Sequence, residues 1–153
     1  MPKQPETRPL SLERLVNEVK GIYAGLVMIE TKCVDVDSNC GSAIDPHGRM
    51  TAEQWQALIG LHRTLLHEHH DFFLASQHPS ATPQLILAPK YAMPARMWEN
   101  GIHSFLEMLR GRLPHSFEHM LTFIYMDYSM MGLLLETVPV FEETWCNVQQ
   151  EEA

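Results

Sequence analysis

The chain has 153 residues, of which 45% are hydrophobic, so it has the length of one domain and enough apolar side chains to bury a core. A formal net charge of -8 excludes the broad basic face of a duplex-DNA-binding protein but leaves room for a local basic patch. The three cysteines have no CxxC spacing, and no signal-peptide pattern follows Met1. These features predict an intracellular protein in a reducing compartment.

The first third of the chain is expected to be a lead-in followed by one long helix. Residues 1–10 are polar and proline-rich, which predicts disorder, and Ser11 is a helix N-cap. Apolar side chains then alternate at steps of three and four, at Leu12, Leu15, Val19, Ile22, Leu26, Ile29, Cys33 and Val36. This seam is typical of an antiparallel helix in a bundle, and a self-pairing coiled coil is the alternative.

The middle of the chain is expected to contain a loop and a second helix. Asp37 to Met50 are rich in Gly, Asp, Asn and Ser, which predicts a loop. Thr51 and Gln54 form a capping-box pattern for a helix that stops between Ser76 and Pro79. A weak helix is predicted over residues 82–87, where Pro89 cuts it short.

The second helix carries a histidine-rich segment, LHRTLLHEHHDFF, that begins like a zinc-protease motif. His67-Glu68 opens the HExxH pattern, but position 71 is aspartate, so the second histidine ligand is missing. The chain also has no GxSxG nucleophile elbow. We therefore predict no metal, no cofactor, no catalytic residue and no enzymatic activity. Structurally, His62 and His69 are expected at the edge of the core, and a solvated, partly basic face is expected from Arg63, His67 and His70.

A third helix, beginning at Pro94 and ending at Leu113-Pro114, carries the candidate site. Its apolar stripe lies opposite a row in which Arg96, His103 and Arg110 are seven residues apart, with Asn100 between them and Arg112 beside them. Guanidinium groups form charge-assisted, bidentate bonds with phosphate, so the row predicts binding of a phosphorylated peptide or of RNA. The alternative is a solvated face on which Glu99 and Glu107 are the local partners.

The next helix, from about Ser116 to Thr137, is apolar on nearly every side, which predicts that it is buried. A membrane span is disfavoured by Asp127 near its middle and by Glu118 and His119 near its start. No strand alternation or internal repeat occurs. The predicted class is all-α, an antiparallel bundle or array of about five helices in one domain over residues 11–146, followed by a polar tail over residues 147–153.

The segment RMWENGIHSFLEMLRGRLPHSFEHML, residues 96–121, resembles the N-terminal part of the fungal branch of the telomerase-activating, ever-shorter-telomeres protein family. The relatives of that family include the SMG adapters of nonsense-mediated mRNA decay, and the similarity extends from Trp55 to Glu143. The resemblance implies a 14-3-3-like, partly tetratricopeptide-like helical domain. It also implies a nuclear or cytoplasmic adapter, without catalysis, that binds phosphorylated protein segments, telomerase RNA or telomeric DNA, within telomerase or messenger ribonucleoprotein particles.

The resemblance also implies positions for phosphate binding. Aligned on Met97-Trp98, a phosphate-gripping residue of the decay adapters falls on His103. A second gripping segment is expected just after Thr144-Trp145, where this chain instead reads CNVQQEEA. The chain is therefore expected to be a truncated gene model, a splice variant or a remnant. Apolar side chains are then expected to lack their covering helices and to promote self-association, at Phe123, Met130, Leu134, Phe141 and Trp145. The alternative function is a self-associating structural module, or a remnant without a ligand.

Overall fold

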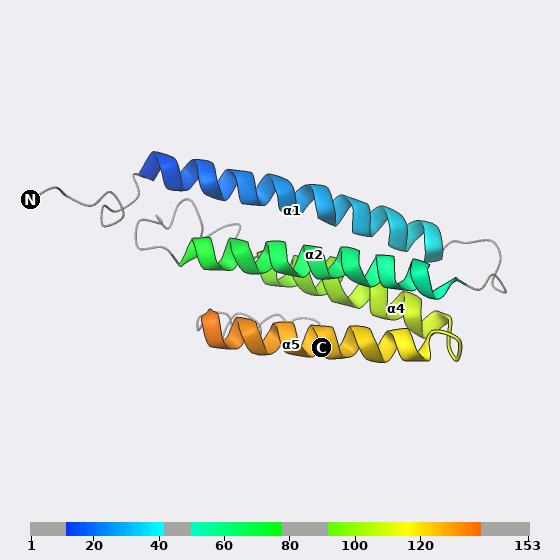
Figure 1. The fold of residues 1–153 in the computed structure, drawn as a ribbon. Helices are drawn as coiled ribbons and strands as arrows, with labels where there is room; N and C mark the ends of the chain where they lie inside the picture. Colours follow the sequence, from blue (N-terminus) through cyan, green and yellow to red (C-terminus); the bar gives the residue numbers. More distant parts are fainter. Residues whose placement is uncertain (1–11, 42–49, 78–91, 139–153) are drawn as a thin grey trace, which may run out of the picture.

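The computed structural model describes residues 12–41, 50–77 and 92–138, and these residues are helical apart from their connections (Figure 1). The elements are α1 (Leu12–Gly41), α2 (Ala52–Ser76), η2 (Met97–His103), α4 (Ser104–Gly111) and α5 (Phe117–Thr137). Residues 92–96, η2 and α4 form one continuous helix whose middle is a π-helix. Within these ranges no strand occurs, so the predicted all-α class is confirmed.

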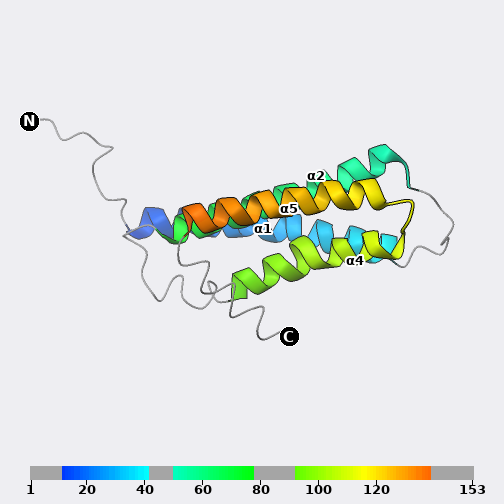
Figure 2. The ribbon, with the colours of Figure 1, turned by 90° about the horizontal axis from the view of Figure 1, so that it is seen from below.

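The helices run up and down along one common direction, as an antiparallel bundle (Figures 1 and 2). α2 packs against α1, against η2 and against α5, while α4 packs against α1 and α5. The two views show α2 between α1 and α5, with α4 to one side. α5 therefore rests on the bundle along α2 and α4, and its remaining faces point outwards.

Several predictions about single segments fall outside the described residues. These are the disordered lead-in, the weak helix over residues 82–87, the exposure of Phe141 and Trp145, and the polar tail. In the part that is described, no helix is long and apolar enough to cross a membrane.

The predicted start and end of α2 are confirmed. The Gln54 backbone N–H donates to Thr51 Oγ1 at 3.1 Å, and the Thr51 N–H donates to Gln54 Oε1 at 2.9 Å, which completes the capping box. The loop predicted from Asp37 is wrong in its first residues, because α1 continues to Gly41. Asp37 is buried and bonded to two other helices, and these bonds favour the additional helical turn.

The seam of α1 lies inside the bundle. Leu15, Val19, Leu26 and Cys33 are buried, so this face is not available for the self-pairing coiled coil. α5, by contrast, is not buried all round as predicted. It buries Phe123, Met130 and Leu134, three of the five side chains that were expected to lack a covering helix, so this part of the prediction is wrong. Among the described helices α5 packs mainly on α2 and α4, so one stripe of an apolar helix enters the core and other apolar side chains of α5 stay exposed.

A buried polar chain connects three helices near the centre of the bundle. His62 on α2 is fully buried; its Nδ1–H donates to the Gly101 carbonyl at 2.9 Å, and its Nε2 lies 3.1 Å from Asp37 Oδ2. The Ser104 hydroxyl donates to the same carboxylate at 2.8 Å. The His62 ring also stacks on Phe105, with centroids 4.5 Å apart. The prediction that His62 lies at the edge of the core is therefore wrong.

Gly101 allows η2 to approach α2 closely. A Cβ atom at this position would lie 3.1 Å from Leu66 Cδ2, a side chain that is itself fully buried. The π-helical turn includes Gly101, whose carbonyl receives the bond from His62. The close backbone approach and the polar bond thus occur at the same residue and fix the position of η2 on α2.

We expect His62→Leu to lower the free energy of unfolding by about 2–4 kcal/mol, because it leaves the Gly101 carbonyl and most of the Asp37 carboxylate buried without partners. Combined with Asp37→Leu, the double variant should show a coupling of about 1–3 kcal/mol in urea titrations. His115→Leu, on an exposed turn, is the control and should change stability by less than about 0.5 kcal/mol. Additive effects of the two core substitutions would contradict this interaction.

Candidate functional site

The structure places the first member of the predicted row, Arg96, against α1. Its Nη2 lies 2.7 Å from Glu30 Oε1, its Nε 3.2 Å from Glu30 Oε2, and its Nη1 donates to the Tyr23 hydroxyl at 2.8 Å. The guanidinium also lies over the Tyr23 ring, and the hydrogen bond to Glu30 raises the Arg96 pKa. Arg96 therefore joins α1 to the start of the third helix, and phosphate would have to displace Glu30 to bind it.

The other members of the row lie further along the third helix. Arg110 Nη2 is 2.6 Å from Glu107 Oε2, and His103 Nε2 is 4.0 Å from the same carboxylate group. These contacts agree with the alternative interpretation, in which the row is a solvated face with Glu107 as a local partner. All three side chains are largely exposed. Arg112 is half-buried and has a contact of its own, and Asn100 accepts a bond from the Ser104 hydroxyl through its backbone carbonyl. Phosphate binding by these five residues stays a prediction.

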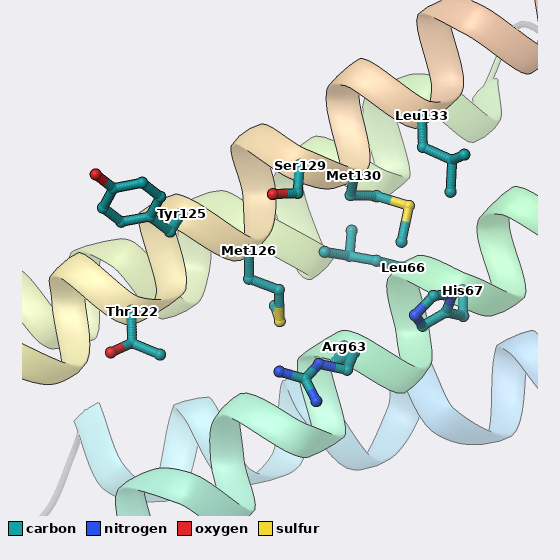
Figure 3. A pocket seen from close by; sticks show the side chains of 9 residues that line it. All are labelled: Arg63, Leu66, His67, Thr122, Tyr125, Met126, Ser129, Met130 and Leu133. Atoms are coloured by element: carbon teal, nitrogen blue, oxygen red, sulfur yellow. The ribbon is translucent and has the colours of Figure 1, made fainter.

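A groove between α2 and α5 is the second candidate (Figure 3). Its volume is about 390 Å³, within the range of small ligand sites. Its walls consist of an apolar floor and a polar rim, formed by Leu66, Met126, Met130, Leu133, Tyr125, Thr122, Ser129, Arg63 and His67. Methionine side chains adapt to irregular shapes, so the floor can accommodate apolar side chains of different shapes.

The two walls are held together at one end by polar bonds around Thr137. The Thr137 hydroxyl donates to the Leu133 carbonyl at 2.7 Å and accepts from His70 Nε2–H at 2.9 Å. Gln77 Nε2 donates to the Thr137 carbonyl at 2.8 Å. His70 is buried, which lowers its pKa, so its predicted place on the solvated face is wrong. These bonds fix the end of α2 to the end of α5 and hold the groove open beside them.

The rim of the groove carries positive charge. Arg63 and His67 are one turn apart on α2, both are exposed as predicted, and both line the groove between α2 and α5 (Figure 3). Within the part of the chain that the structure describes, neither has a hydrogen bond or an ion pair. No carboxylate among the described residues pairs with Arg63 beside the apolar groove, whereas Arg96 and Arg110 are paired with glutamates. The sequence identified the basic face but gave no sign that α5 lies along it.

The buried titratable groups are not arranged for catalysis. Asp37, His62 and Ser104 have the composition of a hydrolase triad, but Ser104 donates to Asp37 instead of His62, and His62 has no exposed surface. Burial, with Asp37 and Glu30 nearby, raises the Cys33 pKa to about 12, so the thiol stays protonated. Burial, aided by Arg96, lowers the His69 pKa to about 3, so this ring is neutral. Among the described residues, no three His, Cys, Asp or Glu side chains gather as a metal site.

Comparisons with protein-family models, with curated proteins and with solved structures find no match to this chain.

Asp127 is a buried acid on the core side of α5. It is 7% exposed, and neither carboxyl oxygen has a hydrogen-bond partner among the described residues. Burial raises its pKa to about 8. The folded chain therefore holds this proton up to about pH 8, whereas an unfolded aspartate releases it near pH 4. Between these two values the folded state binds more protons, so the free energy of unfolding falls as the pH rises.

We expect Asp127→Asn to flatten this part of the pH dependence. From pH 5 to pH 8 the free energy of unfolding of the wild type should fall by on the order of a few kcal/mol more than that of the variant. The reason is that only the wild type has a buried carboxyl group, which must either stay protonated or carry a buried charge as the pH rises. Urea titrations at several pH values would measure the difference. Glu136→Gln, at an exposed position on α5, should leave the profile unchanged. Parallel profiles for wild type and Asp127→Asn would contradict this account of Asp127.

Proposed function

We propose that the chain is a non-catalytic helical adapter that binds a phosphorylated peptide segment in the groove between α2 and α5. The observation that carries the proposal is that two basic side chains, Arg63 and His67, lie on the rim of an apolar groove and have no ion pair within the residues that the structure describes. In this arrangement the phosphate lies against the guanidinium, and an apolar side chain next to it in the peptide enters the space above Met126 and Met130.

The arrangement of charges favours phosphate binding at Arg63 and His67 over binding at the predicted row of Arg96, His103 and Arg110. A phosphate group provides several acceptor oxygens, and arginine binds them in bidentate geometry. At Arg96 or Arg110 an incoming phosphate meets a glutamate that already occupies the guanidinium. At Arg63 no such competition exists in the described structure. His67, one turn away, provides a second donor at the same wall.

The shape of the groove favours a peptide over a nucleic acid. Its floor is lined by aliphatic and methionine side chains, and its volume holds one or two large side chains. Binding to single-stranded nucleic acid instead relies on an extended positive path along the backbone, and the chain has a net charge of -8.

The resemblance to the telomerase-activating and SMG adapters supports the same class of function. It implies phosphoprotein recognition and assigns a phosphate contact to His103, the last residue of η2, which does not line the groove. Both positions are therefore included in the test. The proposal that the partners belong to telomerase or messenger ribonucleoprotein particles rests on the resemblance.

The test is fluorescence anisotropy with a library of labelled peptides that carry a central phosphoserine beside apolar residues, each with an unphosphorylated counterpart. We expect the phosphorylated peptides to bind more tightly. Arg63→Ala should weaken binding about 10- to 100-fold, since a hydrogen bond to a charged group contributes roughly 1.5–3 kcal/mol. His67→Ala should weaken it less, and the matched control Arg110→Ala should leave it unchanged.

Other outcomes would replace the proposal. Loss of binding in His103→Ala and Arg110→Ala, with Arg63→Ala unaffected, would move the site to the row of Arg96, His103 and Arg110 on the third helix. Equal affinity for phosphorylated and unphosphorylated peptides, or binding only to a single-stranded RNA probe, would contradict phosphopeptide recognition. Since Arg63 and Arg110 are both exposed, thermal melts should show the same fold in both variants.

A further inference from the structure

α5 presents an apolar stripe on the side away from the groove. The stripe residues follow one another at alternating steps of four and three, and they are Phe117, Leu121, Ile124, Tyr128, Met131 and Leu135. Five of the six are exposed; Phe117 is 56% and Tyr128 79% exposed, and Met131 is half-buried. Monomeric proteins rarely expose a continuous row of large apolar side chains, so a covering partner is expected.

The spacing of the stripe is symmetric about its own centre. When a second α5 is laid antiparallel on the first, Phe117 faces Leu135, Leu121 faces Met131, and Ile124 faces Tyr128. The same three layers recur in reverse order in the other half. A two-fold interface requires such a symmetric spacing: if Phe117 of one copy contacts Leu135 of the other, then Leu135 of the first copy must contact Phe117 of the second. Steps of four and three are also the pattern with which paired helices interlock side chains.

Charges beside the stripe favour the antiparallel direction. Glu118 lies on its flank and, in an antiparallel pair, falls next to Gly132 of the second copy, where an added Cβ would meet nothing within 4 Å. A parallel pair would bring both Glu118 carboxylates to the same end of the interface. It would also align the two helix dipoles, whereas an antiparallel pair opposes them.

The exposed area is close to what a small stable interface needs. An aromatic side chain carries about 150–250 Å² of surface, so the six stripe residues together present on the order of 500 Å² per copy. The smaller specific interfaces bury roughly 600 Å² per partner. None of the six stripe residues lines the groove, so pairing through the stripe leaves the groove accessible.

We propose that this stripe is a homodimer interface, in which α5 pairs antiparallel with α5 of a second copy around a two-fold axis near residue 126. The dimer carries two grooves, one on each copy. Its formation does not depend on whether the grooves bind a phosphopeptide.

Sedimentation equilibrium of the full chain over a range of concentrations tests the proposal. The wild type should be a dimer, and Ile124→Glu should raise the dissociation constant by about 100-fold or more, because the charge is placed without a partner in the two central layers. The matched control is Met28→Glu on α1, which replaces a side chain that is 57% exposed and should leave the dimer intact. A wild-type monomer at every concentration would overturn the proposal, as would equal effects of the two substitutions.

Cross-linking tests the direction of the pair, in a background in which Cys40→Ser and Cys146→Ser remove two thiols and Cys33 is buried. A mixture of Leu121→Cys and Met131→Cys chains should form a disulfide dimer under oxidation. Leu121→Cys alone should not, because the two thiols would lie ten residues, or about 15 Å, apart along the axis. A cross-link from Leu121→Cys alone, or none from the mixture, would overturn the antiparallel arrangement.

Discussion

The bond chain from Asp37 through His62 to the Gly101 carbonyl is the constraint on which the rest of the bundle depends. It joins the end of α1, the middle of α2 and the π-helical turn of η2 at one buried point. Apolar side chains alone permit helices to slide along one another, whereas a buried polar group is satisfied in a single register. A buried, hydrogen-bonded polar pair adds little net stability over a well-packed apolar replacement, so its contribution here is the choice of register.

That register determines how α5 is placed. The His62 ring stacks on Phe105, and Phe123 of α5 meets Phe105 edge to face with centroids 4.6 Å apart. The bonds at Thr137 then fix the far end of α5 to α2. With one side of α5 held in this way, its other sides become the wall of a cationic groove and an exposed apolar stripe. Both candidate surfaces are therefore consequences of one core contact.

Local signals allowed much of the fold to be predicted from the sequence. The seam of α1, the capping box at Thr51 and the break near Pro114 are each encoded within a few residues, and all three agree with the structure. The faces of α5 were not predictable in this way, because a helix that is apolar all round carries no mark of which stripe is buried. The same limit applies to His62, whose burial depends on Asp37 and Gly101, 25 and 39 residues away in the sequence. Of the candidate site, the sequence provided the cations on α2, but the groove arises only when α5 is placed beside them.

The central claim is that His62 is held on both ring nitrogens inside the core, and nitrogen-edited NMR of histidine-labelled protein tests it most directly. The Gly101 carbonyl can only accept, so Nδ1 must carry a hydrogen, and a second hydrogen must be shared between Nε2 and Asp37. We expect two His62 protons that exchange slowly with water, one of which loses its protection in Asp37→Leu. A single protected proton, or a ring whose protons exchange as fast as those of the exposed His115, would contradict it.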